Sequence, residues 1–452
     1  MGKRSKRERQ EDLWIATGAI VETPGHAFYD RLNEVLSRQG FDRRVEYLCR
    51  RYYRGPRGRP SIAPGVYFRM LLIGYFEGLD SERAIAWRVA DSLSLRKFLG
   101  YGLDETTPDH STVSRTRRLY WLSTHQAVFG WVLKVLAGEG LVRGDTIAID
   151  ATTLEANAAM RSIVRRDTGE GYEAYLKSLA AQAGLENPTR EELARFDRKR
   201  KKKTSNRDWK HPHDPDARIT KMKDGRTHLA HKAEHAVDLS SGALLALTLH
   251  PADRGDTTTI FDTLDEAQAM AAGAGIGKVK AAVTDKGYHS ADVVVGLHQQ
   301  GVRGYVSEPD RGRQCWKDKR VEQEQVYANR RRVRGGRGQR LQKMRGELSE
   351  RSMAHMYETG GMRRLHLRGR TNSLKRLLVQ GAGFNLSLLM RALLGAGTPR
   401  QATRRLLGSV FDLRSCLRRL LTRVSASLTV LHTSVDRLPA QLAHTPPVAV
   451  IP

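Results

Sequence analysis

The sequence predicts an α/β protein with a mixed sheet behind an N-terminal helical region. Two short apolar runs each lead to an aspartate, residues 146–150 ending at Asp150 and residues 279–285 ending at Asp285. Strand-like and helix-like patterns alternate between and after these runs, whereas residues 64–140 have helical spacing throughout. Apolar or β-branched runs bounded by turn residues indicate buried strands, so we expect both aspartates to stand at strand ends.

The length and composition indicate the number of domains and the kind of partner. The 452 residues suffice for two or three domains with a substantial core. Lys and Arg number 77 against 49 Asp and Glu, a formal net charge of +28, which favours a polyanionic partner, most simply nucleic acid. The three cysteines form no CxxC pair, which argues against a disulfide framework or a structural zinc site: Cys49, Cys315 and Cys416.

No long apolar segment is expected to cross a membrane. The basic N-terminus lacks an apolar run behind it, and the most apolar early segment, residues 66–76, is short and contains Arg69. We therefore expect a soluble, intracellular protein.

The N-terminal part divides into a basic segment, residues 1–57, and a helical domain, residues 58–140. The Gly- and Pro-rich residues 55–60 are expected to form a linker. The last short helix, starting near residue 108, carries three arginines: Arg115, Arg117 and Arg118. Such a helix is typical of a helix-turn-helix that contacts DNA, but an ordinary helical bundle with a solvated basic face fits equally well.

Residues 141–395 are expected to form the second domain, with a polar insertion at about 160–215. The insertion contains a helical stretch near residues 172–182 and a basic run, residues 198–203, which is expected to be solvated and could touch phosphates. We expect a hairpin of strands 228–238 and 243–249, helix 257–272, strand 279–285, helix 290–300 and strand 303–306. This order is that of an RNase H-like mixed sheet.

The last part of the chain has three segments. Residues 309–345 are Arg-rich and poor in apolar side chains, residues 347–358 have a helical pattern that stops at Gly360, and residues 371–395 predict a strongly apolar helix. The basic residues 396–452 are expected to be a poorly ordered tail.

Two carboxylates at neighbouring strand ends suggest a metal site. Mg²⁺ prefers oxygen ligands and keeps several waters, and two such ions can clamp a phosphodiester. Asp150 and Asp285 fit this chemistry if their strands are neighbours. The residues alone leave the third carboxylate open among four candidates: Glu308, Glu347, Glu350 and Glu358.

The histidines and the remaining aspartates give a weaker indication of function. His228, His231 and His235 have the spacing of a helical metal face, but they lie in a predicted strand, so zinc is not expected. His289 could contact a phosphate or form a hydrogen bond within its turn. Three aspartates are expected to be caps or turn residues rather than ligands: Asp145, Asp253 and Asp256.

Several blocks together resemble bacterial insertion-sequence DDE transposases. Residues 147–157, IAIDATTLEAN, and residues 283–290, VTDKGYHS, look like the two aspartate blocks of that family. Residues 350–355, ERSMAH, with the later residues 360–364 and 384–386, resemble its glutamate-bearing helix and downstream segment. The helical region up to Arg118 is similar to the family's N-terminal domain.

The resemblance implies a catalytic, metal-binding triad of Asp150, Asp285 and Glu350 that uses Mg²⁺ or Mn²⁺. The family often has an apolar residue before the glutamate and an aromatic residue three positions after it, where this chain has Ser349 and Met353. Glu347 therefore stays the alternative to Glu350.

The resemblance also implies the reaction and the partners. Water cleaves the DNA at the element end, and the released 3′ hydroxyl attacks target DNA. The partners would be the terminal inverted repeats and target DNA, bound by a homodimer in the bacterial cytoplasm, at the nucleoid. Further DNA contacts would come from Lys286, His289 and Arg351 and from the arginines of residues 330–345. Two alternatives are an RNase H-fold nuclease and a catalytically inactive, transposase-derived DNA-binding protein.

Overall fold

The structure is a computed structural model that describes residues 25–53, 61–200, 204–222, 224–310, 312 and 314–405. The chain forms two compact units, Met1–Pro399 and Arg400–Pro452, and the first contains every element named below. The predicted linker at residues 55–60, part of the basic run at 198–203 and most of the predicted tail lie outside the described residues.

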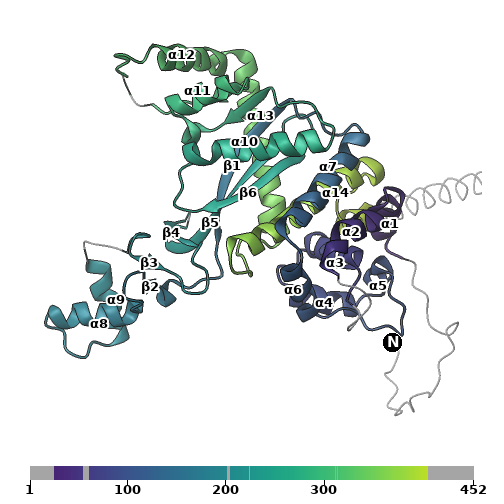
Figure 1. Cartoon of the computed structure of the whole chain (residues 1–452), viewed down its shortest axis with the longest axis horizontal. Helices are drawn as coiled ribbons and strands as arrows, with labels where there is room; N and C mark the ends of the chain where they lie inside the picture. The colour runs from purple at the N-terminus through teal and green to yellow at the C-terminus, as the bar shows by residue number, and fades with distance from the viewer. Residues whose placement is uncertain are drawn as a thin grey trace, which may run out of the picture. The chain divides into compact units, whose positions relative to one another are not determined.

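The N-terminal region is a set of helices joined by capped turns (Figure 1). Pro64 opens α3 and Gly78 ends it in the left-handed conformation (φ 69°) that favours glycine. Ser81 and Asp109 cap α4 and α6 through their side chains. The helices are α1 (Ala27–Arg38), α2 (Phe41–Cys49), α3 (Pro64–Glu77), α4 (Glu82–Ala90), α5 (Leu93–Leu99), α6 (His110–Leu119) and α7 (Leu122–Gly138).

Helices α1 and α2 lie within residues 1–57, the segment that the sequence analysis describes as basic. Phe28, Leu32, Leu36 and Phe41 on these helices are buried. The apolar side chains recur every three or four residues between charged ones, so each helix buries one face while the segment stays polar on average.

The sheet confirms the predicted RNase H-like order. Its strands are β1 (Thr146–Glu155), β4 (Arg218–Lys221), β5 (Thr227–Asp238), β6 (Leu244–Pro251), β7 (Ala281–Thr284) and β8 (Arg303–Val306). The order is β4-β5-β1-β7-β8, with β6 paired to β5. β1, β5 and β6 form the antiparallel part, and β7 and β8 join in parallel to β1 through helical crossovers.

Helices cover both faces of this sheet. Helix α10 (Asp256–Gly273) precedes β7, α11 (Ala291–Gln299) precedes β8, and α12 (Arg320–Arg334) and α13 (Gly336–Met353) follow it. Glu234 of β5 bonds to Thr259 of α10, whereas the next residue, His235, bonds to Ser352 of α13. Because successive residues of a strand point to opposite faces, α10 and α13 lie on opposite faces of the sheet.

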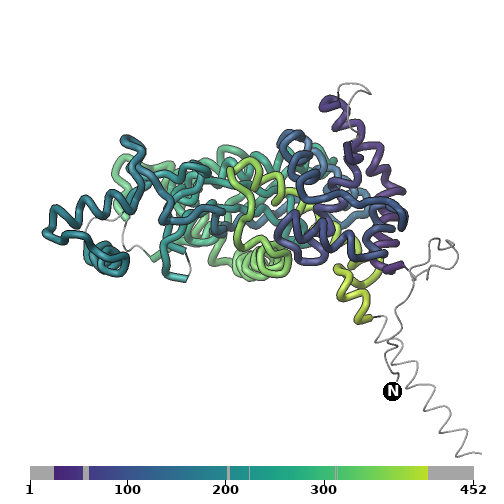
Figure 2. The backbone as a smooth tube through the Cα atoms, turned by 90° about the horizontal axis from the view of Figure 1, so that it is seen from below, coloured from purple at the N-terminus to yellow at the C-terminus, as the bar shows by residue number. Residues whose placement is uncertain are grey.

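The insertion between β1 and β4 has a small core of its own. Its elements are β2 (Val164–Arg165), α8 (Tyr172–Gln182), α9 (Arg190–Lys199) and β3 (Trp209–Lys210). Trp209 and Ile163 anchor one apolar cluster, and Leu176 and Leu193 anchor a second. In both views α8 and α9 lie away from the main sheet (Figures 1 and 2).

The segment after β8 is more helical than its composition predicts. Helices α12 and α13 include most of residues 309–345, for which the sequence shows only an Arg-rich composition poor in apolar side chains. A π-helix (Ala354–Thr359) continues α13, and Tyr357 within it donates to, or accepts from, His235 Nε2 at 2.5 Å. Apart from Arg345, the charged residues of α13 are exposed, so a few inward positions decide how the helix packs.

The predicted apolar helix is α14 (Arg370–Leu394), which packs against α7, α3 and β6. Asn385 at its centre donates to the Leu244 carbonyl and accepts from the Leu244 amide, both at 2.9 Å. Within the described residues, the stretch Arg370–Arg405 is long and apolar enough to cross a membrane, but 72% of its apolar window is buried inside the protein. That burial is expected of a core helix.

Candidate active site

The parallel pairing of β1 and β7 brings the two predicted aspartates together. Their last register pair is Ile149 with Thr284, and Asp150 and Asp285 each follow it by one residue. β1 does not end at Asp150 as predicted, because it stays paired with β5 as far as Glu155. Asp150 therefore lies where β7 leaves the sheet, while its own strand continues.

An arginine of α13 occupies one side of Asp150. Arg345 Nη1 lies 2.8 Å from Asp150 Oδ2, and each side chain is only 19% exposed. Desolvation by burial raises the pKa of Asp150 to about 6, Arg345 opposes that rise, and Asp285 and Asp256 add to it. The pKa is thus raised mainly because the carboxylate is desolvated, and Arg345 offsets only part of that effect.

A third aspartate, Asp256, borders the same space. A Cβ atom on Gly287 would lie 2.5 Å from Asp256 Oδ2 and 3.1 Å from Asp285 Oδ1. Only a glycine leaves this space open between the two carboxylates. Asp285 Oδ1 also accepts the Gly287 amide at 2.9 Å, which fixes the turn after β7.

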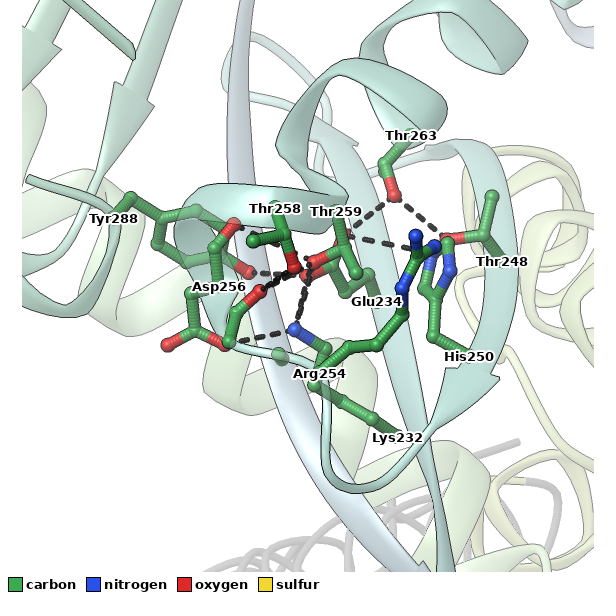
Figure 3. A network of polar contacts seen from close by, with 12 residues as sticks. Lys232, Glu234, Thr248, His250, Arg254, Asp256, Thr258, Thr259, Thr263 and Tyr288 are labelled. Carbon is green, nitrogen blue, oxygen red and sulfur yellow. Dashed lines mark hydrogen bonds and ion pairs between the residues drawn. The ribbon is translucent and has the colours of Figure 1, made fainter. Parts of the chain in front are cut away.

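Behind these aspartates lies a buried polar network on the α10 face (Figure 3). Lys232 Nζ contacts Asp256 Oδ1 and Glu234 Oε1, each at 3.0 Å. The hydroxyls of Thr263 and Tyr288 donate to Glu234 at 2.6 and 3.2 Å. The network thus ties β5 and the start of α10 to the turn that carries Asp285.

The two glutamates of α13 lie on different sides of the helix. Arg345, Ser349 and Ser352 face the sheet, since Arg345 contacts Asp150 and the two serines are fully buried. Glu347 is about 200° around the helix from both Arg345 and Ser349, on the solvent side, where it pairs with Arg351 at 2.6 Å.

Glu350 is exposed at the flank of α13. Its angular position is about 200° from Leu348, which would touch a Cβ on Gly242 at 3.3 Å. Gly242 lies in the β5–β6 turn, beside the start of β1. Glu350 therefore lies on the flank of α13 opposite to Leu348, away from the β5–β6 turn.

The other two glutamates have local partners. Glu308 accepts two hydrogen bonds from Arg330, each 2.7 Å long, which lower its pKa. Glu358 pairs with Arg363. Both carboxylates are therefore already engaged by arginines.

The arginines of α6 differ in exposure. Arg115 and Arg118 are exposed, and Arg115 contacts Ser111 of its own helix. Arg117 was predicted to contact DNA, but it is only 7% exposed and pairs with Glu82 at 3.1 Å. Arg117 stands about 200° around the helix from Arg115 and about 100° from Arg118, so the three do not share one face, and its contact with DNA stays a prediction.

The predicted DNA contacts around the aspartates are also divided. Lys286 is exposed directly after Asp285, and Arg351 is exposed on α13. His289 is buried, with 2% of its surface exposed, so a contact with DNA would require a conformational change, and it stays a prediction.

The donor set fits a divalent cation, although the side chains do not enclose one. Asp150, Asp256 and Asp285 supply the oxygen ligands that Mg²⁺ and Mn²⁺ prefer. Among the described residues, no group of three His, Cys, Asp or Glu side chains is arranged to hold a metal ion. Asp150 Oδ2 pairs with Arg345 and Asp256 Oδ1 pairs with Lys232, whereas Asp256 Oδ2 borders the space above Gly287.

Sequence reasoning placed Arg345 among the arginines that contact DNA and not beside Asp150, missed Lys232 in the site and assigned Asp256 to a cap. Neither cation had a distinguishing pattern, because each was one basic residue among 77. Asp256 does begin α10, but its other side faces Asp285. Only the tertiary contacts reveal that second role.

The mixed sheet and the paired aspartates define an RNase H-like protein with an acidic centre of the kind that acts on phosphodiesters. The chain matches the family described as Transposase DDE domain over residues 144–378 and that described as Transposase domain (DUF772) over residues 18–119. No curated protein and no solved structure matches it. The chain belongs to the DDE transposases, enzymes of DNA transposition that bind the ends of their elements and use divalent metal ions.

Proposed function

We propose that this protein cuts DNA at the ends of an insertion sequence and joins the freed 3′ ends to target DNA. The supporting observation is the register of β1 and β7, which sets Asp150 and Asp285 side by side in the DDE domain. Water attacks the phosphodiester at the element end, and the released 3′ hydroxyl then attacks a target phosphodiester, displacing its 3′ oxygen.

The proposal assigns roles to individual residues. Asp150 and Asp285 hold Mg²⁺, and Glu350 completes the triad from the flank of α13. Bound Mg²⁺ would polarise the phosphoryl oxygens and lower the pKa of the attacking water. Lys286 and Arg351, both exposed near the triad in sequence, would bind backbone phosphates.

The partners follow from the same reaction. Arg115 and Arg118 on α6 would contact the terminal inverted repeats. A homodimer would bring the two element ends together, and the reaction would take place in the cytoplasm on nucleoid DNA. Of the alternatives, a nuclease would cleave without joining ends, and an inactive descendant would bind ends only.

The proposed function is tested on the element's own ends. The full chain is incubated with a labelled duplex that carries one inverted repeat, plasmid target DNA and Mg²⁺. We expect a nick at the element boundary and a product joined to the plasmid, both abolished by EDTA. Cleavage without joined product would support the nuclease, and binding without cleavage would support the inactive protein.

Cation binding should depend on pH because of Asp150. Its pKa, raised to about 6, means that the free folded protein keeps this proton in more acidic solution, and a cation must displace it. We expect Mn²⁺ affinity in calorimetry to fall by up to about tenfold for each pH unit below about 6, and to level off above about 7. If the Mn²⁺ affinity at about pH 5 equalled that at about pH 7, Asp150 would not be a ligand of the cation.

A further inference from the structure

We propose that Asp256 is a further carboxylate of the cleavage centre, held beside Asp285 by Lys232, and that the buried Glu234 is a positioning residue because it fixes Lys232. The inference rests on the proposed function, since it assigns roles in that same centre. It adds an acidic residue that the triad does not include.

The position of Asp256 supports its role in the cleavage centre. One of its oxygens, Oδ1, is 3.0 Å from Lys232 Nζ. The other, Oδ2, borders the space above Gly287 that Asp285 Oδ1 also borders. Asp256 is one-third exposed, so the carboxylate can reach an ion in solution while its other oxygen stays anchored.

The burial of Glu234 supports its role as a positioning residue. Its carboxylate is fully buried and has four donors, Lys232, Thr259, Thr263 and Tyr288 (Figure 3). A buried charge is tolerated only with such partners, and a satisfied network holds its members in one arrangement. Glu234 therefore fixes the Lys232 ammonium at a defined place beside Asp256.

A role in stabilising α10 alone does not account for this arrangement. An aspartate at the start of a helix is favourable without any ion partner. Here a lysine that is only 7% exposed reaches it from β5. Tyr288, three residues after Asp285, donates to the same Glu234, so one network positions both Asp256 and the turn of Asp285.

The test compares Asp256→Asn with Asp253→Asn in the full chain. Asp253 lies in the same loop, but it pairs with Arg218 at 3.5 Å, which makes it a matched control. We expect Asp256→Asn to weaken Mn²⁺ binding in calorimetry about tenfold and to raise the Mg²⁺ concentration for half-maximal cleavage similarly. DNA-end binding without metal should be unchanged, and Asp253→Asn should match the wild type in all three measurements.

The positioning role of Glu234 is tested by a double-mutant cycle. If Glu234→Gln acts through Asp256, it should weaken Mn²⁺ binding in the wild type and have little further effect in Asp256→Asn. Should Glu234→Gln not fold, Thr263→Val removes one donor to the same carboxylate and replaces it in the cycle. Additive effects would overturn the positioning role.

The outcomes separate this inference from the proposed function. Wild-type Mn²⁺ affinity and Mg²⁺ dependence in Asp256→Asn would overturn the role of Asp256 while leaving the triad intact. A wild-type protein that neither binds Mn²⁺ nor cleaves element ends would instead overturn the proposed function, and the inference with it.

Discussion

Asp150→Asn and Asp285→Asn are each expected to lower cleavage of the element end by about a thousandfold or more, while binding to that end is retained. Each aspartate would supply the negative oxygen that holds a divalent cation against the scissile phosphate. Loss of that cation removes several kcal/mol of transition-state stabilisation, and each 1.4 kcal/mol corresponds to about tenfold in rate. The assay is single-turnover cleavage of the labelled end duplex in Mg²⁺.

Asp145→Asn provides the matched control for this experiment. Asp145 precedes β1 directly and pairs with Lys280 at 2.8 Å, beyond the opposite end of the β1–β7 pairing. The Asp145→Asn protein should cleave the element end at the wild-type rate. Near-wild-type cleavage by Asp150→Asn or Asp285→Asn, with the protein folded, would show that the acidic centre is not the cleavage centre.

The sheet could be predicted from the sequence because its strands carry their own local patterns. Residues 281–284 are apolar or β-branched and fully buried, as their pattern predicts. The order of elements then limited the possible topologies, and the parallel pairing of β1 with β7 follows from it. The end of β1 was misplaced, because the polar residues after Asp150 gave no indication that β5 is long enough to pair with them.

The helical surroundings of the site were harder to predict, because polar helices have weak patterns. In α13 only a few positions are buried, among them Gly338, Ser349 and Ser352, and none is a large apolar residue. An Arg-rich segment with small inward residues looks unstructured in sequence. Which arginine faces Asp150, or which of Arg115, Arg117 and Arg118 turns inward, depends on the orientation of the helix and on partners distant in sequence.

The choice between Glu350 and Glu347 is the second prediction with a large expected effect. Glu350→Gln is expected to lower cleavage by about a thousandfold, and Glu347→Gln by less than about threefold. Both changes keep the size of the side chain and lie on the same exposed stretch of α13, so each serves as the other's control. Cleavage in Mg²⁺ and binding to the element end without metal are the two measurements.

The geometry of α13 is the reason for the expected asymmetry. The helix crosses the sheet from β8 to β5, since Gln342 donates to the Tyr305 carbonyl at 2.7 Å and Ser352 contacts His235 at 2.9 Å. Its two flanks therefore face the two ends of the strands. Leu348 faces the β5–β6 turn, so Glu350 lies on the other flank, which we expect to face Asp150 and Asp285.

For Glu347 to reach Asp150 and Asp285, α13 would have to rotate by about half a turn. That rotation would separate Arg345 from Asp150 and move the two buried serines out of the core. Glu350 already lies on the flank away from the β5–β6 turn, and among the described residues it has no ion pair to give up. Loss of activity in Glu347→Gln with activity kept in Glu350→Gln would therefore mean that α13 rotates when DNA binds. That rotation could be detected directly, because it would expose Ser349 and Ser352, and cysteines placed at these positions would become reactive only in the DNA complex.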